Sequence, residues 1–95
     1  RAQFSFQGRS VVISGGSRGL GLVMARQLAA KGARLTLLAR NPDELKRAET
    51  ELKGSGAEVL TIACDVRRQE QVNAAMKAAE KRAVIRAILL GRIGL

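Results

Sequence analysis

The segment from Ser14 to Gly21 has the residue types and the spacing of a turn that binds phosphate. Its sequence, Ser-Gly-Gly-Ser-Arg-Gly-Leu-Gly, follows a short apolar run and precedes a stretch with helical spacing. A turn that leads from a strand into a helix brings backbone N–H groups and the positive end of the helix to one point, which suits an anion. Glycine permits the tight turn, the approach of a diphosphate to the backbone and the close packing of helix on strand. We assign these roles to Gly15, Gly19 and Gly21, and the candidate phosphate contacts are Ser14, Gly15, Ser17, Arg18, Gly19, Leu20 and Gly21.

The spacing of the glycines distinguishes among the known phosphate-binding loops. A P-loop is excluded because no Gly-Lys-Ser/Thr follows the turn. The six-residue pattern Gly-x-Gly-x-x-Gly also fails, because Met24 stands where its last glycine would be. The pattern that fits is Gly-x-x-x-Gly-x-Gly.

The elements that must position this turn alternate between short β-branched or Leu-rich runs and longer stretches with helical periodicity. The expected strands are residues 10–14, 34–39 and 58–64, and the expected helices are residues 20–31, 41–53 and 68–82. Asn41 is the expected cap of the second helix, and Glu44 stands where a capping box places an acid. This order predicts an α/β fold in which three βα units form a parallel sheet covered by helices.

Residues 83–95 form a basic and apolar tail that fits this alternation less well than residues 1–82. The run from Ala83 to Leu90 could extend the third helix or form a fourth, poorly bounded strand. The tail could also be an amphipathic membrane-binding helix or a truncated or altered chain end, and we favour the altered end. Without a fourth strand the first strand would have an open edge, so we expect marginal stability or self-association through that edge.

With Ser14 in front, the glycine pattern resembles the Thr-Gly-x-x-x-Gly-x-Gly signature of the short-chain dehydrogenase/reductase family, with Ser in place of Thr. The resemblance covers about residues 6–82 and includes Ala39-Arg40-Asn41 after the second expected strand and Asp65-Val66 after the third. It implies that residues 1–82 are the N-terminal half of a Rossmann-like NAD(P)-binding domain, a partial doubly wound parallel sheet with strand order 3-2-1.

The resemblance also implies that Asp65 and Val66 contact the cofactor, with the Asp65 carboxylate at the adenine amino group. Asp65 has a structural alternative, because an aspartate there could be the N-cap or a first-turn acid of the third helix. The two interpretations are compatible with each other.

Two arginines favour NADP over NAD as the cofactor. Arg40 follows the second expected strand and Arg18 lies in the glycine turn, so both stand where a 2′-phosphate would be bound. Guanidinium groups pair with phosphate, often through two hydrogen bonds, whereas an acid there would repel it. NAD-preferring members of the family tend to carry an acid at the position of Ala39. For each arginine the alternative is an ordinary exposed side chain.

The residues that would carry catalysis are not found in the sequence. The resemblance implies a Tyr-x-x-x-Lys pair with a Ser and an Asn, in which tyrosine is the general acid or base and lysine lowers its pKa. The chain contains no tyrosine, so we assign no catalytic residue. We expect the cofactor-binding portion of an NADP-dependent enzyme that moves hydride between NADPH and a carbonyl or alcohol. The alternative is a non-enzymatic nucleotide-binding or oligomerising fragment.

Composition excludes several other classes of function. The chain has no His, Trp or Tyr and one cysteine, which rules out a His/Cys metal cage, a disulfide framework and a Ser-His-Asp triad. The net charge of +9 is compatible with a polyanion, but with only two Phe there is no platform for stacking bases, so we expect no nucleic-acid partner. No apolar run reaches the roughly 18 residues of a membrane span. We expect a cytoplasmic protein in which Cys64 is a small buried residue.

Overall fold

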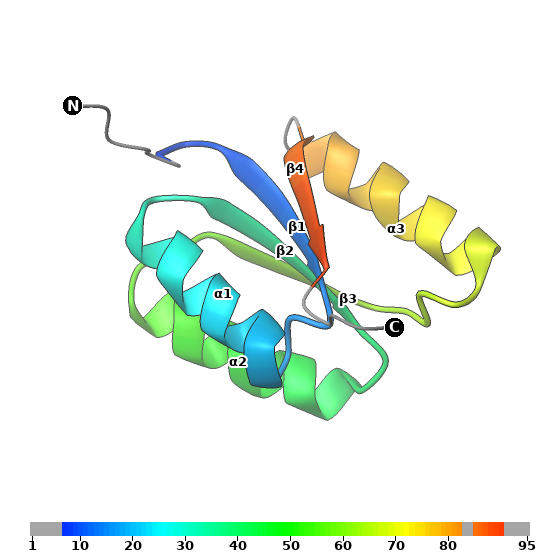
Figure 1. Ribbon diagram of the computed structural model, residues 1–95, viewed down its shortest axis with the longest axis horizontal. Coiled ribbons are helices and arrows are strands. Elements are labelled where there is room, and N and C mark those ends of the chain that lie inside the picture. The colour runs from blue at the N-terminus through cyan, green and yellow to red at the C-terminus, as the bar shows by residue number, and fades with distance from the viewer. Residues whose placement is uncertain (1–6, 83–84, 91–95) are drawn as a thin grey trace.

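The computed structural model describes the backbone of residues 7–82 and 85–90 and the side chains of residues 7–78. Strands and helices alternate along the chain (Figure 1). Their bounds are β1 Ser10–Ser14, α1 Gly19–Ala30, β2 Arg34–Ala39, α2 Pro42–Gly54, β3 Val59–Ala63, α3 Gln69–Arg82 and β4 Ile85–Leu90. The three strands and three helices expected from the sequence are confirmed, and β4 is the fourth strand that the sequence left open as one of two alternatives for the tail.

The four strands form one parallel sheet in the order β3-β2-β1-β4. β1 pairs with β2 along its whole length, from Ser10 opposite Arg34 to Ser14 opposite Leu38. β2 pairs with β3 in the same parallel sense. The predicted α/β class and the strand order 3-2-1 are therefore confirmed.

β4 decides between the alternatives for the tail in favour of a fourth strand, and it corrects the expected open edge of β1. Residues 85–90 form a strand parallel to β1 and paired with it, with Val11 opposite Ala87 and Ser14 opposite Leu90. The run therefore neither extends α3, which ends at Arg82, nor forms a membrane-binding helix. The edge of β1 that we expected to be open is occupied, because the backbone of this apolar run satisfies N–H and C=O groups that β1 would otherwise expose. Residues 83–84 and 91–95 lie outside the described residues, so the altered chain end stays a prediction.

The helices cover the two faces of the sheet, with α1 and α2 on one face and α3 on the other (Figure 1). Successive residues of β1 point to opposite faces, as the geometry of a strand requires. Val11 and Ile13 belong to the larger core, and Val12 belongs to the smaller one. The larger core also contains Ala25, Leu28, Ala33, Leu35, Leu37, Leu45, Ala48, Leu52 and Val59, and the smaller contains Leu38, Cys64 and Ala75. β1 is thus a central strand that is buried on both faces, which agrees with its unbroken apolar sequence.

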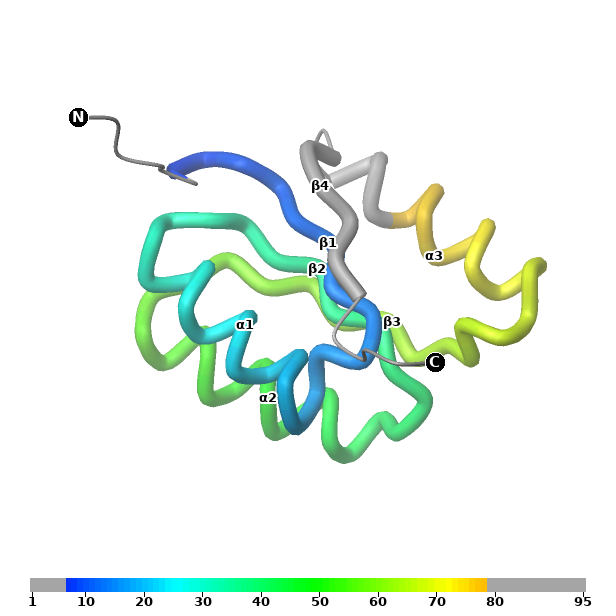
Figure 2. Tube along the Cα trace, in the orientation of Figure 1, coloured from blue at the N-terminus to red at the C-terminus, as the bar shows by residue number. Residues whose placement is uncertain are grey.

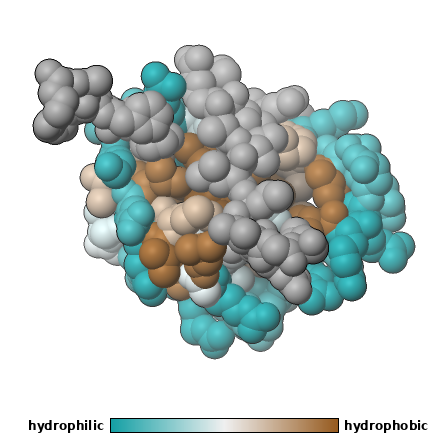
Figure 3. Space-filling view, in the orientation of Figure 1, coloured by the Kyte–Doolittle hydropathy of each residue, from teal (hydrophilic) through white to brown (hydrophobic). Residues whose placement is uncertain are grey.

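α1 and α2, the two helices that pack on the larger core, differ in how fully their apolar side chains are buried. α2 buries Leu45, Ala48 and Leu52, which lie at helical spacing along one side. In α1, by contrast, Leu20 and Val23 are exposed by 46% and 42%. Figure 3 shows apolar side chains gathered in the middle of this view, with polar side chains around the periphery. In the part of the chain that the structure describes, no helix is both long and apolar enough to cross a membrane.

Candidate nucleotide-binding site

The loops that follow β1, β2 and β3 meet at one end of the sheet. The strands are parallel, so their carboxyl ends lie along the same edge, and Figure 2 shows the chain leaving all three strands on that side. The turn after β1 and its flanks hold Ser14, Gly15, Ser17, Arg18, Gly19, Leu20 and Gly21, the loop after β2 begins with Arg40, and the loop after β3 holds Asp65 and Val66. The structure thus brings all ten predicted residues to one edge.

The glycine turn is held tightly between β2 and the start of α1. The Gly15 N–H donates to the Leu38 carbonyl oxygen over 2.7 Å, which ties the turn to β2. Gly15 has a φ of +73°, a backbone conformation that other residues resist. A Cβ at Gly21 would overlap the Gly15 carbonyl group. Gly21 therefore allows the first turn of α1 to lie directly against the loop, as predicted for close packing.

The amino end of α1 is open to an anion. Its N-cap residue is Arg18, and among the described residues no side chain caps this helix and no acid occupies its first turn. The first N–H groups of a helix have no partner within the helix, and they carry the positive end of its dipole. These donors lie beside the loop at the carboxyl end of β1, where the sequence predicts a phosphate-binding turn.

The amino end of α2 differs, because it is already capped. The Asn41 side-chain oxygen accepts hydrogen bonds from the N–H groups of Asp43, at 2.9 Å, and Glu44, at 3.2 Å. The predicted cap at Asn41 is confirmed. The predicted capping box is only half formed, because the Glu44 carboxylate contacts the glycine turn instead of the Asn41 backbone.

Glu44 joins the glycine turn to α2 through two neighbouring side chains. The Ser17 hydroxyl donates to Glu44 Oε1 over 3.2 Å, and Arg18 Nη1 lies 3.7 Å from Glu44 Oε2. Ser17 is buried, whereas the Arg18 side chain is 80% exposed and the Glu44 side chain 21% exposed. No local pattern predicts this contact, because Glu44 lies 27 residues beyond Ser17 and only the fold brings the two side chains together.

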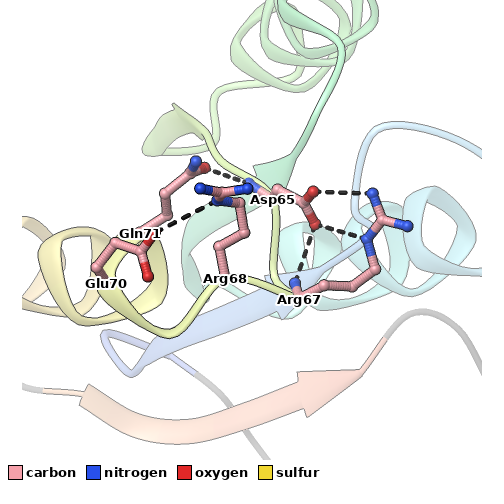
Figure 4. Close-up of polar contacts among 5 residues, drawn as sticks. All are labelled: Asp65, Arg67, Arg68, Glu70 and Gln71. Atoms are coloured by element: carbon pink, nitrogen blue, oxygen red, sulfur yellow. Dashed lines mark hydrogen bonds and ion pairs between the residues drawn. The ribbon is translucent and has the colours of Figure 1, made fainter.

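Asp65 is tied into its own loop (Figure 4). Its carboxylate accepts hydrogen bonds from Arg67 Nε at 3.0 Å, Arg67 Nη2 at 2.9 Å and the Arg67 backbone N–H at 3.0 Å. These bonds lower the pKa of Asp65 to about 2, and the positive charge of Arg40 contributes to the lowering. On the other side of Asp65, its N–H donates to Gln71 Oε1 over 2.7 Å. The carboxylate is therefore ionised at neutral pH and already has one cationic partner.

The structure rejects the helix-capping alternative for Asp65. α3 begins at Gln69, and the Asp65 carboxylate bonds to an N–H of the preceding loop rather than to one of the helix. The loop turns through a bond from the Arg68 N–H to the Asp65 carbonyl oxygen at 2.9 Å, which keeps the aspartate outside the helix. Arg67 and Gln71 were not among the residues predicted for the site, although the spacing Asp-x-Arg is a local signal for the ion pair.

An open hollow of about 270 Å³ lies at the ends of β2 and β3. It is lined by Arg40, Ala63, Cys64, Asp65 and Gln71. Cys64 is 6% exposed, so its prediction as a small buried residue is confirmed, and burial raises the pKa of its thiol. Arg40 is exposed, and within residues 7–78 no carboxylate forms an ion pair with it. No group of three or more His, Cys, Asp or Glu side chains in this described range could hold a metal ion.

A comparison with protein families matches residues 9–89 to the model described as short chain dehydrogenase. The chain belongs to the short-chain dehydrogenase family. The strand order, the glycine turn and the acid after β3 are thus features of a member of this family rather than of an unrelated α/β protein.

Relatives of this short-chain dehydrogenase chain are oxidoreductases. An uncharacterized oxidoreductase, YxnA of Bacillus subtilis (strain 168), is 44% identical over 63 residues, which are 66% of this chain and 18% of YxnA. L-sorbose reductase from Gluconobacter frateurii, solved with NADPH and L-sorbose, is 35% identical with a TM-score of 0.87 over 96% of this chain and 35% of the reductase.

A third relative was solved with the other nicotinamide cofactor. It is a short chain dehydrogenase/reductase from Burkholderia phymatum in complex with NAD, 34% identical with a TM-score of 0.79 over 83% of this chain and 28% of that one. The chain therefore spans between 18% and 35% of the length of these three relatives. Members of the family that share this fold bind NAD or NADPH.

Proposed function

We propose that this chain is the NADP(H)-binding part of a short-chain dehydrogenase/reductase. The observation that carries the proposal is the start of α1, where an uncapped helix end and a closely packed glycine turn leave N–H groups open to an anion. In Rossmann-like folds the anion at this point is the diphosphate of a dinucleotide. The residues proposed to surround the diphosphate are Ser14, Gly15, Ser17, Gly19, Leu20 and Gly21.

The loops after β2 and β3 are proposed to hold the adenosine end of the cofactor. The hollow beside Asp65 suits adenine, because an ionised carboxylate accepts a hydrogen bond from an amino group. Val66 is 46% exposed and offers apolar surface next to it. Arg40 and Arg18 are the proposed partners of a 2′-phosphate, and among the described residues no carboxylate lies within ion-pair distance of the exposed Arg40.

A bound nicotinamide would supply hydride transfer between a carbonyl and an alcohol. The residues of this chain would bind and orient the cofactor, and the absence of tyrosine from the 95 residues leaves no candidate for the general acid. We therefore assign hydride transfer to a chain that also carries the family's catalytic residues.

Calorimetric titration of the 95-residue chain with NADPH and with NADH tests the proposal. We expect saturable binding that is tighter for NADPH. Arg40→Ala should weaken NADPH binding by about five- to tenfold and leave NADH binding nearly unchanged, because one charge-assisted contact to the 2′-phosphate is lost. Arg34→Ala, which removes the same charge from the opposite end of β2, is the control and should change neither. Equal affinity for the two cofactors would refute the assignment of NADP.

A further inference from the structure

We propose that Glu44 is a specificity-determining residue, because it competes with a 2′-phosphate for Arg18. The inference rests on the proposed function, in which Arg18 is one of two arginines that receive the 2′-phosphate. It adds a residue from α2 that acts through Arg18 and lowers the preference for NADP(H) over NAD(H).

The contacts of Glu44 place a negative charge where the phosphate-binding cation lies. Glu44 Oε2 is 3.7 Å from Arg18 Nη1, and its other oxygen accepts the hydrogen bond of the buried Ser17 hydroxyl. The Ser17 bond fixes the carboxylate on the side of the glycine turn. Arg18 is therefore paired before any ligand arrives, and a 2′-phosphate gains it only by replacing the carboxylate.

The backbone beneath Glu44 is also fixed, which makes this arrangement more than a chance surface contact. The Glu44 N–H is bonded to the Asn41 side chain at 3.2 Å, so the first turn of α2 is anchored at both its backbone and its side chain. A carboxylate held at 21% exposure keeps its position better than a freely rotating surface acid. The pair is nevertheless weak, because Arg18 is 80% exposed and an exposed ion pair contributes little. A phosphate dianion can displace the Glu44 carboxylate from Arg18, but it then gains less affinity than it would from an unpaired arginine.

The two arginines of the proposed 2′-phosphate site consequently differ. Among the described residues Arg40 forms no ion pair, although its charge acts on Asp65 at a longer distance, whereas Arg18 is paired with Glu44. NADH carries no 2′-phosphate, so its binding does not require Arg18 to leave Glu44. The competition therefore acts on NADPH alone, and its removal should change the ratio of the two affinities.

Glu44→Gln tests this inference, because glutamine keeps the size of the side chain and an oxygen for Ser17 but loses the charge that holds Arg18. Asp43→Asn is the matched control: it removes one negative charge from the same turn of α2, and Asp43 pairs with no cation in the described part of the chain. The affinities of NADPH and NADH are measured by calorimetry for the unaltered chain, both variants, Arg18→Ala and the double variant Arg18→Ala/Glu44→Gln. Circular dichroism verifies that each variant is folded.

We expect Glu44→Gln to tighten NADPH binding by about three- to fivefold, the range of one exposed ion pair, with NADH unchanged. Asp43→Asn should alter neither, and the effect of Glu44→Gln should vanish when Arg18 is absent. If the unaltered chain binds NADPH more tightly than NADH, but Glu44→Gln changes the affinities for both cofactors equally, the proposed function stands and this inference is overturned. An effect that persists in the Arg18→Ala background, or that Asp43→Asn reproduces, overturns it as well. If neither cofactor binds the unaltered chain or Glu44→Gln, the proposed function and the inference both fail.

Discussion

Asp65 shows how strongly one neighbour can set the state of a site residue. Arg67 donates to it from two side-chain nitrogens and from the backbone, which lowers the Asp65 pKa from 3.8 to about 2. A carboxyl with a lower pKa in the folded chain stabilises the fold above its unfolded pKa. That contribution is lost as the pH falls from about 4 through about 2.

Replacing Arg67 should therefore raise the Asp65 pKa. We expect Arg67→Ala to shift it from about 2 toward 3.8, because both side-chain hydrogen bonds and the nearby positive charge disappear. The carboxyl-carbon chemical shift of Asp65, followed by NMR against pH, measures the change. Arg68→Ala removes the neighbouring arginine, which pairs with Glu70 instead, and should leave the Asp65 pKa where it is. A value near 4 in the unaltered chain would contradict the ion pair.

Gly21 is required for the contact between α1 and the glycine turn. A methyl group at Gly21 would meet the Gly15 carbonyl, whereas one at Gly54 would meet nothing. We expect Gly21→Ala to lower the free energy of unfolding by about 1–3 kcal/mol, as overpacking does. Gly54→Ala should leave it unchanged or raise it by up to about 1 kcal/mol, because the unfolded chain loses freedom. Urea titration of both variants checks the difference, and equal stabilities would show that α1 does not lie against the turn.

At the scale of the element, the start of α2 depends on one side chain. Asn41 satisfies two N–H groups of the first turn. Asn41→Ala should cost about 1 kcal/mol of stability, measured as a lower midpoint in urea, because those two donors lose their partner. Asn41→Asp keeps an oxygen in the same place and should retain most of the stability. If the alanine variant is as stable as the unaltered chain, the cap does not stabilise α2.

The elements themselves were predictable because their signals are local. Some of these signals are the unbroken apolar run of β1, the Asn41-Pro42 start of α2 and the glycines at the ends of α1 and α2. Each stands within a few residues of the element that it determines. The edge on which the site lies was predictable too, because parallel strands bring their carboxyl ends together. Local signals fail where a side chain serves two elements. Glu44 stands at the capping-box position, three residues after Asn41. In the folded chain its carboxylate instead accepts a hydrogen bond from the Ser17 hydroxyl.

The shared location of the candidate residues could be predicted from the sequence, but the pairing of Arg18 with Glu44 could not. The ten candidate residues lie at one edge as expected, yet the partners of Asp65 and Arg18 are set by how two loops turn. The exposure of Leu20 and Val23 could not be predicted either. Helical spacing predicts a helix, but it does not say which side of the helix packs against other elements.

For the whole molecule, the decisive feature is the pairing of β1 on both sides. β4 occupies the edge that would otherwise be free, and the strand between the two partners is almost completely buried. A chain that ends at residue 82 would leave one row of β1 backbone groups unpaired. We expect that shortened chain to unfold at a lower urea concentration than the 95-residue chain and to associate through the exposed edge.

Size-exclusion chromatography with light scattering, run beside the urea titration, checks both parts of this expectation. A molar mass that rises with protein concentration only for the shortened chain would support association through the exposed edge. Equal midpoints and a monomeric mass for both chains would mean that β4 adds nothing to the sheet in solution.

The parallel sheet also places the connections that enter its strands at one end and the candidate residues at the other. The short connections that enter β2 and β3, residues 31–33 and 55–58, lie at the opposite edge from the ten candidate residues. A peptide tag or fluorophore attached at the connection before β3 would lie at the opposite end of the sheet from the proposed nucleotide site. The protein can therefore be labelled or immobilised at this end while the candidate residues stay unmodified.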